Sequence, residues 1–181
     1  MAAQKWNFDP VHSHIGFSVR HLMISKVGGH FKSWTGNLMI DEADPSQSKV
    51  EVEIDAASID TKEAQRDDHL RSADFLEAQK FPKIRFRSTR VEKVAEDRYR
   101  IAGDFTIRDV TRSIELDTEY LGRAKDPWGG ERVGFSAKTA INRKDYGLNF
   151  NMPLEGGGVL VGERVDISLE VEAVKDVAAN Q

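Results

Sequence analysis

The sequence has 181 residues, with 26 basic and 30 acidic side chains, a formal net charge of −4 and no cysteine. This length fits one domain that buries a core without cross-links. The lack of cysteine excludes a disulfide scaffold, a thiolate nucleophile and a Cys-ligated metal. The slight acidity argues against nucleic-acid binding, which needs clustered basic charge. A mean hydropathy of −0.51 and the lack of a long apolar run exclude a transmembrane helix.

The N-terminal part of the chain is predicted to form strands. Residues 1–6 contain no apolar leader region, so we expect a cytoplasmic location, or a periplasmic one if a leader has been removed. Ile15, Phe17 and Val19 share one face of a strand. The segment 27–40 shifts its apolar parity between Phe31 and Trp34 beside glycines, which predicts a bulge or bend.

The middle of the chain holds one strand and one helix. Residues 50–55 alternate strictly between apolar and acidic side chains, as expected for a strand with one buried face. The segment 61–73 is polar and rich in helix formers, so we predict a short helix capped by Asp60 or Thr61. Leu70 and Phe75 could plug or line one end of a sheet structure.

The rest of the chain repeats the strand pattern. Alternating segments lie at 84–87, 99–107, 114–120, 133–141 and 165–173, and turn signals separate them, including a glycine loop at 156–158. About eight strands at hairpin-like spacing favour an antiparallel sandwich or barrel. We therefore expect an all-β fold with a short α-helix inserted near residues 61–73. One domain would span residues 1–175, and residues 176–181 would form a frayed tail.

An eight-stranded barrel has an interior that side chains fill or that holds one small ligand. The inward-facing set here is rich in Phe, Ile, Leu and Val and carries few polar groups. A cavity of this composition would take a long apolar molecule. The alternative is that the same residues fill a packed core, and the pattern alone leaves both open.

Candidate chemistry is sparse. His12 and His14 could share a metal, with His21 or His30 as a third ligand, but no downstream His or Glu has the usual spacing. The alternative is polar surface histidines. Asp67 and His69 could act as an acid–base pair, or they could belong to a polar network that ties the helix to the barrel rim.

Basic residues near the predicted rim allow a third kind of site. If two or three of them converge on a barrel mouth, they could hold a phosphate or carboxylate head group. The alternative is a solvated strand face that discourages edge pairing. These residues are Arg85, Arg87, Arg90, Arg108, Arg112 and Arg143.

A set of motifs in chain order resembles the YceI-like family. They are WNFDPVHS at 6–13, SIDT at 58–61, RDDHLRSADFL at 66–76, FPKIRFRST at 81–89, GDFTI at 103–107, INRKDYG at 141–147 and VGERV at 161–165. The resemblance implies a single antiparallel eight-stranded lipocalin-like barrel whose apolar tunnel binds a polyisoprenoid or similar amphiphilic lipid. It supplies no metal, cofactor or catalytic residues, so we expect no enzyme. Many family members are exported to the periplasm, and members often form homodimers. Asp109 and Ser113 depart from the family's usual Gly and Pro in one turn.

Strand parity selects most of the expected ligand-binding wall, and Phe31, Leu70 and Phe75 could close or line one of its ends. The expected wall consists of Phe17, Val19, Phe31, Ile40, Val52, Ile54, Leu70, Phe75, Ile84, Phe86, Ile101, Phe105, Leu116, Phe135, Ile167 and Leu169. The leading hypothesis is binding, with transport or storage, of a long-chain isoprenoid or similar lipid. One alternative is a hydrolase or isomerase for a lipid-like substrate that uses His12, His21, Asp67 or His69. Another is an interaction protein with no ligand.

Overall fold

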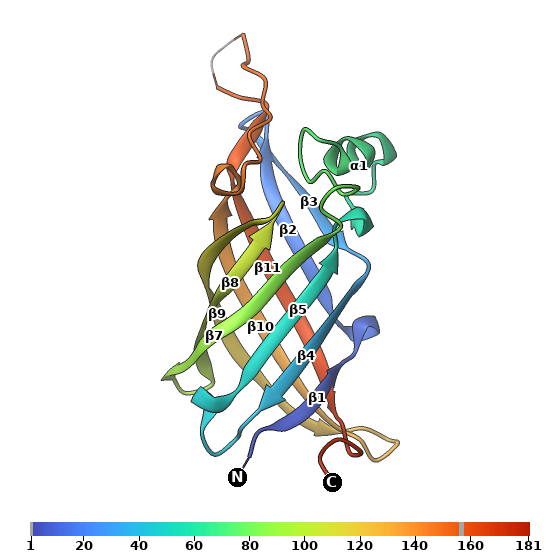
Figure 1. Cartoon of the computed structure of the whole chain (residues 1–181), viewed down its shortest axis with the longest axis vertical. Helices are drawn as coiled ribbons and strands as arrows, with labels where there is room; N and C mark the ends of the chain where they lie inside the picture. The colour runs from blue at the N-terminus through green and yellow to red at the C-terminus, as the bar shows by residue number, and fades with distance from the viewer. Residues whose placement is uncertain (1, 156–157) are drawn as a thin grey trace.

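The computed structural model describes residues 2–155 and 158–181, and the described residues form one antiparallel β-sheet that curls into a barrel (Figure 1). The strands of this sheet are β1 (Gln4–Phe8), β2 (His14–His21), β3 (Ser25–Phe31), β4 (Trp34–Ile40), β5 (Lys49–Asp55), β6 (Ile59–Asp60), β7 (Lys83–Ala95), β8 (Arg98–Ile107), β9 (Val110–Lys125), β10 (Glu131–Asn142) and β11 (Val161–Lys175).

Eight of these strands close the barrel. The ring runs β1-β4-β5-β7-β8-β9-β10-β11 and closes where β1 pairs with the end of β11, with Trp6 opposite Lys175 and Phe8 opposite Ala173. The predicted eight-stranded antiparallel barrel is therefore confirmed. The described residues contain three further strands, because β2, β3 and the short β6 continue the sheet from the first part of β11.

The bend predicted within 27–40 separates two strands. β3 ends at Phe31 and β4 begins at Trp34, so Lys32 and Ser33 make the corner. Lys32 N donates to Ser58 O and Asp55 N donates to Ser33 O, which fixes this corner to the next part of the chain. The change of apolar parity in the sequence marks the place where the chain leaves one strand and starts the next.

The short helix α1 (Ala64–Arg71) lies inside the predicted range and at one end of the barrel (Figure 1). Its cap is Glu63, whose carboxylate accepts from Gln65 N and Arg66 N, so the prediction of Asp60 or Thr61 as the cap is wrong. Thr61 is instead buried and donates to Asp67 Oδ1 through both its backbone N–H and its hydroxyl. The structure thus ties the helix to β6 by a buried polar contact. Among the described residues, no helix is long and apolar enough to cross a bilayer.

The two ends of the chain meet at the barrel end opposite α1 (Figure 1). The Asn180 side chain accepts from Lys5 N and donates to Lys5 O, and Asn7 donates to Asp176. These contacts belong to the segment 176–181, whose fraying stays a prediction.

Candidate functional site: an apolar tunnel inside the barrel

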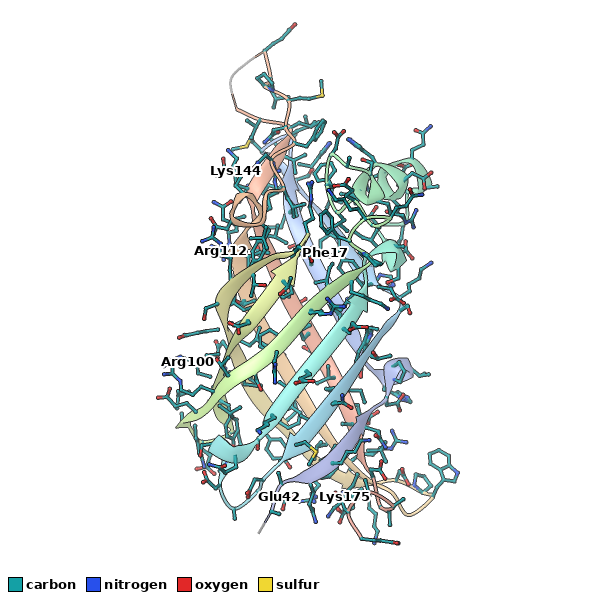
Figure 2. All side chains as sticks on the ribbon, in the orientation of Figure 1. Phe17, Glu42, Arg100, Arg112, Lys144 and Lys175 are labelled. Atoms are coloured by element: carbon teal, nitrogen blue, oxygen red, sulfur yellow. The ribbon has the colours of Figure 1, made fainter. Side chains whose placement is uncertain are left out.

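A cavity of about 860 Å³ runs through the barrel from the α1 end to the loop between β4 and β5. Its volume lies in the range of natural ligand-binding pockets, about 300–1,000 Å³. The inward faces of the strands make its wall, and most of the wall residues are aliphatic or aromatic. Phe17 of β2 lines this cavity, and Figure 2 shows Arg100 of β8 at the outer edge of the barrel. We call this cavity the tunnel.

All sixteen side chains expected on the wall line the tunnel. Strand parity placed most of them, because a pleated strand directs every second side chain inward. Leu70 and Phe75, which lie on α1 and just after it, line the α1 end. The structure therefore brings these residues together around one space. That they contact a ligand stays a prediction.

The accessibility of the wall distinguishes a tunnel from a packed core. In a close-packed interior, inward aliphatic and aromatic side chains are almost fully buried. Here Phe17, Ile101, Phe135 and Ile167 are only half-buried although they face inward from strands of the ring or its extension. Buried residues form one cluster that contains Ile54 and Ile84 and two smaller clusters around Trp6 and Phe86, and members of all three clusters line the cavity. The barrel interior is thus open between the two ends, so the packed-core alternative does not describe this structure.

The α1 end of the tunnel combines aromatic and polar side chains. The rings of His69, Phe75 and Phe150 contact one another edge to face at centroid distances of 4.8–5.2 Å. Arg66 also lines the tunnel and is held by 2.8 Å bonds to the hydroxyl and carbonyl of Thr61. An amphiphile could therefore place a polar head group here and its apolar chain further inside.

Arg143 is the most unusual polar residue on the wall, because its side chain is buried and has no carboxylate within 4.0 Å among the described residues. It donates instead to the backbone carbonyls of Leu148, Gly162 and Val161 at 2.6, 2.8 and 3.2 Å. Burial lowers the pKa of Arg143. These bonds fix the segment after the 3₁₀-helix η4 (Arg143–Tyr146) to the start of β11.

A charged cluster lies at the opposite end. Arg123 contacts Glu42 at 2.6 Å and Glu131 at 3.1 Å, and its guanidinium lies over the Trp6 ring at 5.5 Å. Arg123 and Glu42 line the tunnel, and Figure 2 shows Glu42 at the end opposite Lys144. Both ends of the tunnel are therefore polar, and its middle is apolar.

Among the described residues the candidate histidines form no group of three, although the ring centroids of His14 and His30 lie 5.3 Å apart. His12 lies in the 3₁₀-helix η1 (Pro10–His12) and His14 begins β2, so they do not share a strand face. His12 Nδ1 instead contacts Asp9 at 2.8 Å and Glu172 at 3.4 Å. Arg132 binds the same two carboxylate oxygens at 2.8 and 3.4 Å. Because Arg132 and His12 already contact these two carboxylate oxygens, we interpret Asp9, His12 and Glu172 as part of an ion-pair network outside the tunnel.

The candidate acid–base residues are also separated. Asp67 is buried beneath Thr61 and is absent from the tunnel wall, whereas His69 and His21 line it. His69 Nε2 lies 2.7 Å from Asp74 Oδ2, so the histidine has a carboxylate partner other than the predicted one. The structure does not pair Asp67 with His69, because the two side chains leave α1 in different directions. Asp67 instead accepts from Thr61, which agrees with the alternative of a polar network that holds the helix on the barrel.

Most of the candidate head-group arginines lie outside the barrel. Arg85 and Arg87 pair with Glu53 and Glu51 of the neighbouring strand. Arg90 pairs with Glu92 and Arg108 with Glu77, while Arg112 donates to the Asp145 carbonyl. Of the six, Arg143 alone lines the tunnel.

Sequence reasoning missed part of the wall. Some missed residues share strand parity with predicted ones and could have been found by extending the same faces, namely Leu38, Val50, Ile114, Val133, Val165 and Val171. Others carry no such signal, because loops or the helix bring them to the tunnel ends, namely Gln65, Arg66, Leu148, Phe150 and Leu160.

Comparisons with known proteins agree with this geometry. The sequence model described as a YceI-like domain matches residues 6–173. A UPF0312 protein of Photorhabdus laumondii is 40% identical over 165 residues, which cover 91% of this chain and 82% of the relative. The crystal structure of BcnA from Burkholderia cenocepacia has a TM-score of 0.80 at 18% identity, covering 92% of this chain and 99% of that one. A polyisoprenoid binding domain from Saccharophagus degradans, described as implicated in plant cell wall breakdown, has a TM-score of 0.65 at 14% identity, covering 94% and 98%.

Proposed function

Because the chain belongs to the YceI-like domain family, we propose that its tunnel binds a long-chain isoprenoid or a similar amphiphilic lipid, and that the protein transports or stores this lipid without transforming it. The observation that carries the proposal is the apolar tunnel of about 860 Å³ with polar residues at both ends. The polyisoprenoid binding domain among the structural neighbours gives the ligand class its support.

The binding force would be burial of the lipid chain. Each 100 Å² of apolar surface removed from water contributes about 2.5 kcal/mol before the costs of ordering and association. A flexible chain offers several hundred Å² of such surface, so it needs few polar contacts. Arg66 and His69 at one end, or Arg123 at the other, offer hydrogen-bond donors to a head group.

The test is extraction of the protein purified from its host with organic solvent, followed by mass spectrometry. We expect an apolar lipid in about equimolar amount. Ile167 faces the tunnel, so Ile167→Trp should reduce the bound lipid strongly. Ser168 follows it on β11, is exposed and points outward, so Ser168→Trp is the matched control and should retain the lipid. Lipid-free wild-type protein, or equal lipid in both variants, would contradict the proposal.

The remaining expectations need their own measurements. Turnover of the extracted lipid that depended on His69 would favour the enzyme alternative over a binding protein. Light scattering would measure the expected homodimer. Fractionation of the host cell would distinguish the cytoplasmic location from the periplasmic one. These three points stay predictions.

A further inference from the structure

The turn between β2 and β3 carries three consecutive apolar residues on its surface. Leu22, Met23 and Ile24 are all exposed, Ile24 to 83%. Met152 is also exposed and lies beside this turn, because Leu22 N donates to Leu160 O and Leu160 N donates to Met152 O. We call these four side chains the apolar tip. Figure 1 places the β2–β3 turn at the same end of the barrel as α1.

The backbone of the turn does not explain these residues. Leu22 and Met23 have φ values of 53° and 65°, a left-handed conformation that favours Gly, Asn or Asp. A turn with this geometry usually carries small polar residues. Here it presents large apolar side chains to the solvent, which is the opposite of what turn formation alone favours. We therefore interpret the apolar tip as a surface that another molecule covers.

Two positive charges lie directly below the apolar tip. Arg20 of β2 is opposite Lys26 of β3 in the strand register. Like charges at opposed positions destabilise a sheet, and no carboxylate of the described residues lies within 4.0 Å of either one. The nearby acids Glu163 and Asp166 are bound to Lys144 and Arg164, whereas Glu155 is exposed and has no ion pair within the part of the chain that the structure describes. The Arg20 guanidinium donates to the Met23 carbonyl at 3.5 Å, but neither cation has a carboxylate partner among the described residues, so both are left to bind an external anion.

We propose that the apolar tip docks on an anionic lipid bilayer. The four apolar side chains would enter the boundary between head groups and acyl chains. Arg20 and Lys26 would then lie at the depth of the lipid phosphates. Two copies of this chain meeting tip to tip would bring four such charges together, which disfavours self-association through the same surface.

The tip is continuous with the tunnel. Arg20, His21 and Leu160 line the tunnel and also flank the turn. Docking would therefore bring the α1 end of the tunnel against the bilayer. A lipid could then pass between the acyl-chain region of the bilayer and the apolar tunnel. The docking itself does not depend on the proposed function, since a protein with an empty tunnel would still bind through the tip.

The experiment is co-sedimentation of the full chain with vesicles of phosphatidylcholine alone or of equimolar phosphatidylcholine and phosphatidylglycerol. We expect the chain to bind the anionic vesicles. Its binding should be about tenfold or more weaker with neutral vesicles, and also with anionic vesicles in high salt. Ile24→Glu should lower binding by about tenfold or more, because it places a charge at the apolar boundary. Arg20→Glu combined with Lys26→Glu should do the same without changing the apolar residues.

Matched controls lie at the other end of the barrel. Val177 and Trp128 are exposed to 66% and 83%, and Lys93 is exposed near the β7–β8 hairpin (Figure 1). Val177→Glu, Trp128→Ala and Lys93→Glu should leave vesicle binding unchanged. Circular dichroism of every variant verifies the fold, and if Ile24→Glu fails to fold, the double charge variant provides the test.

Three outcomes would overturn docking through the tip: no vesicle binding by the wild type, equal binding by the tip variants, or loss of binding in Trp128→Ala alone. Concentration-dependent dimers abolished by Ile24→Glu, without vesicle binding, would assign the tip to a second copy instead. The lipid content of Ile24→Glu after extraction reports on the tunnel separately, because Ile24 does not line it.

Discussion

Replacing Arg143 with leucine should destabilise the protein by about 3 kcal/mol. The guanidinium makes three charge-assisted bonds to the carbonyls of Leu148, Gly162 and Val161. Each buried carbonyl that loses its donor costs about 1–3 kcal/mol. Val161 O keeps the Asn151 side chain as a second donor, at 2.8 Å. Removal of a buried charge also returns part of its desolvation cost. Two carbonyls at this cost lose about 2–6 kcal/mol together, and the returned desolvation cost brings the expected loss to about 3 kcal/mol.

Equilibrium unfolding in urea measures this loss. We expect a lower midpoint with an unchanged slope for Arg143→Leu. Arg143→Lys should recover only part of the loss, because one ammonium cannot reproduce the fork that reaches three carbonyls. The matched control is Arg164→Leu, since the Arg164 side chain is exposed and its ion pair among the described residues is with Asp166, and it should cost less than about 0.5 kcal/mol. A loss below about 1 kcal/mol for Arg143→Leu, or full recovery by lysine, would refute this reasoning.

Two further predictions concern packing and pH. Gly103→Ala should cost about 2 kcal/mol, because its Cβ would lie 2.6 Å from the Arg87 carbonyl oxygen and 2.5 Å from Phe86 Cζ. Gly134→Ala, whose Cβ would meet nothing closer than 3.7 Å, is the thermal-unfolding control and should be nearly neutral. The pKa of Asp9 falls from 3.8 to about 2 through its bonds to His12 and then Arg132. Because the pKa of Asp9 is lower in the folded protein than in the unfolded chain, the ionised carboxylate stabilises the fold above about pH 4. This stabilisation is lost as the pH falls from about 4 through 2. Asp9→Asn should therefore lose about 1–2 kcal/mol at pH 7 and match the wild type in acid; a gap of constant size across this pH range would contradict the assignment.

The barrel could be predicted from the sequence because strand periodicity is a local signal. Val165, Ile167 and Leu169 alternate with polar residues, and this pattern alone assigns each side chain to one face. The change of parity near Phe31 likewise marked the corner between two strands. The same faces therefore identified much of the tunnel wall before the structure was known.

The ends of the tunnel could not be predicted in this way. Arg66 and Phe150 reach the tunnel because a helix and a loop fold over the barrel end, and no periodic pattern reports such packing. The helix cap was misassigned for a related reason. Thr61 is a good cap by residue type, but its hydroxyl is engaged by buried Asp67 and Glu63 replaces it. Tertiary contacts decide such positions, and a single sequence does not contain them explicitly.

The position of β11 has a consequence for how the protein is made. This last strand pairs with β10, with β1 and with β2. A ribosome makes β11 after the other strands, so β1 and β2, which pair with β4 and β3 on one side, must wait for it before their second edge is paired. Until then the aliphatic faces of the earlier strands have no enclosure and are open to aggregation. The barrel is therefore expected to close only after β11 has been made, and a chain that stops before β11 should be recognised by chaperones as unfolded.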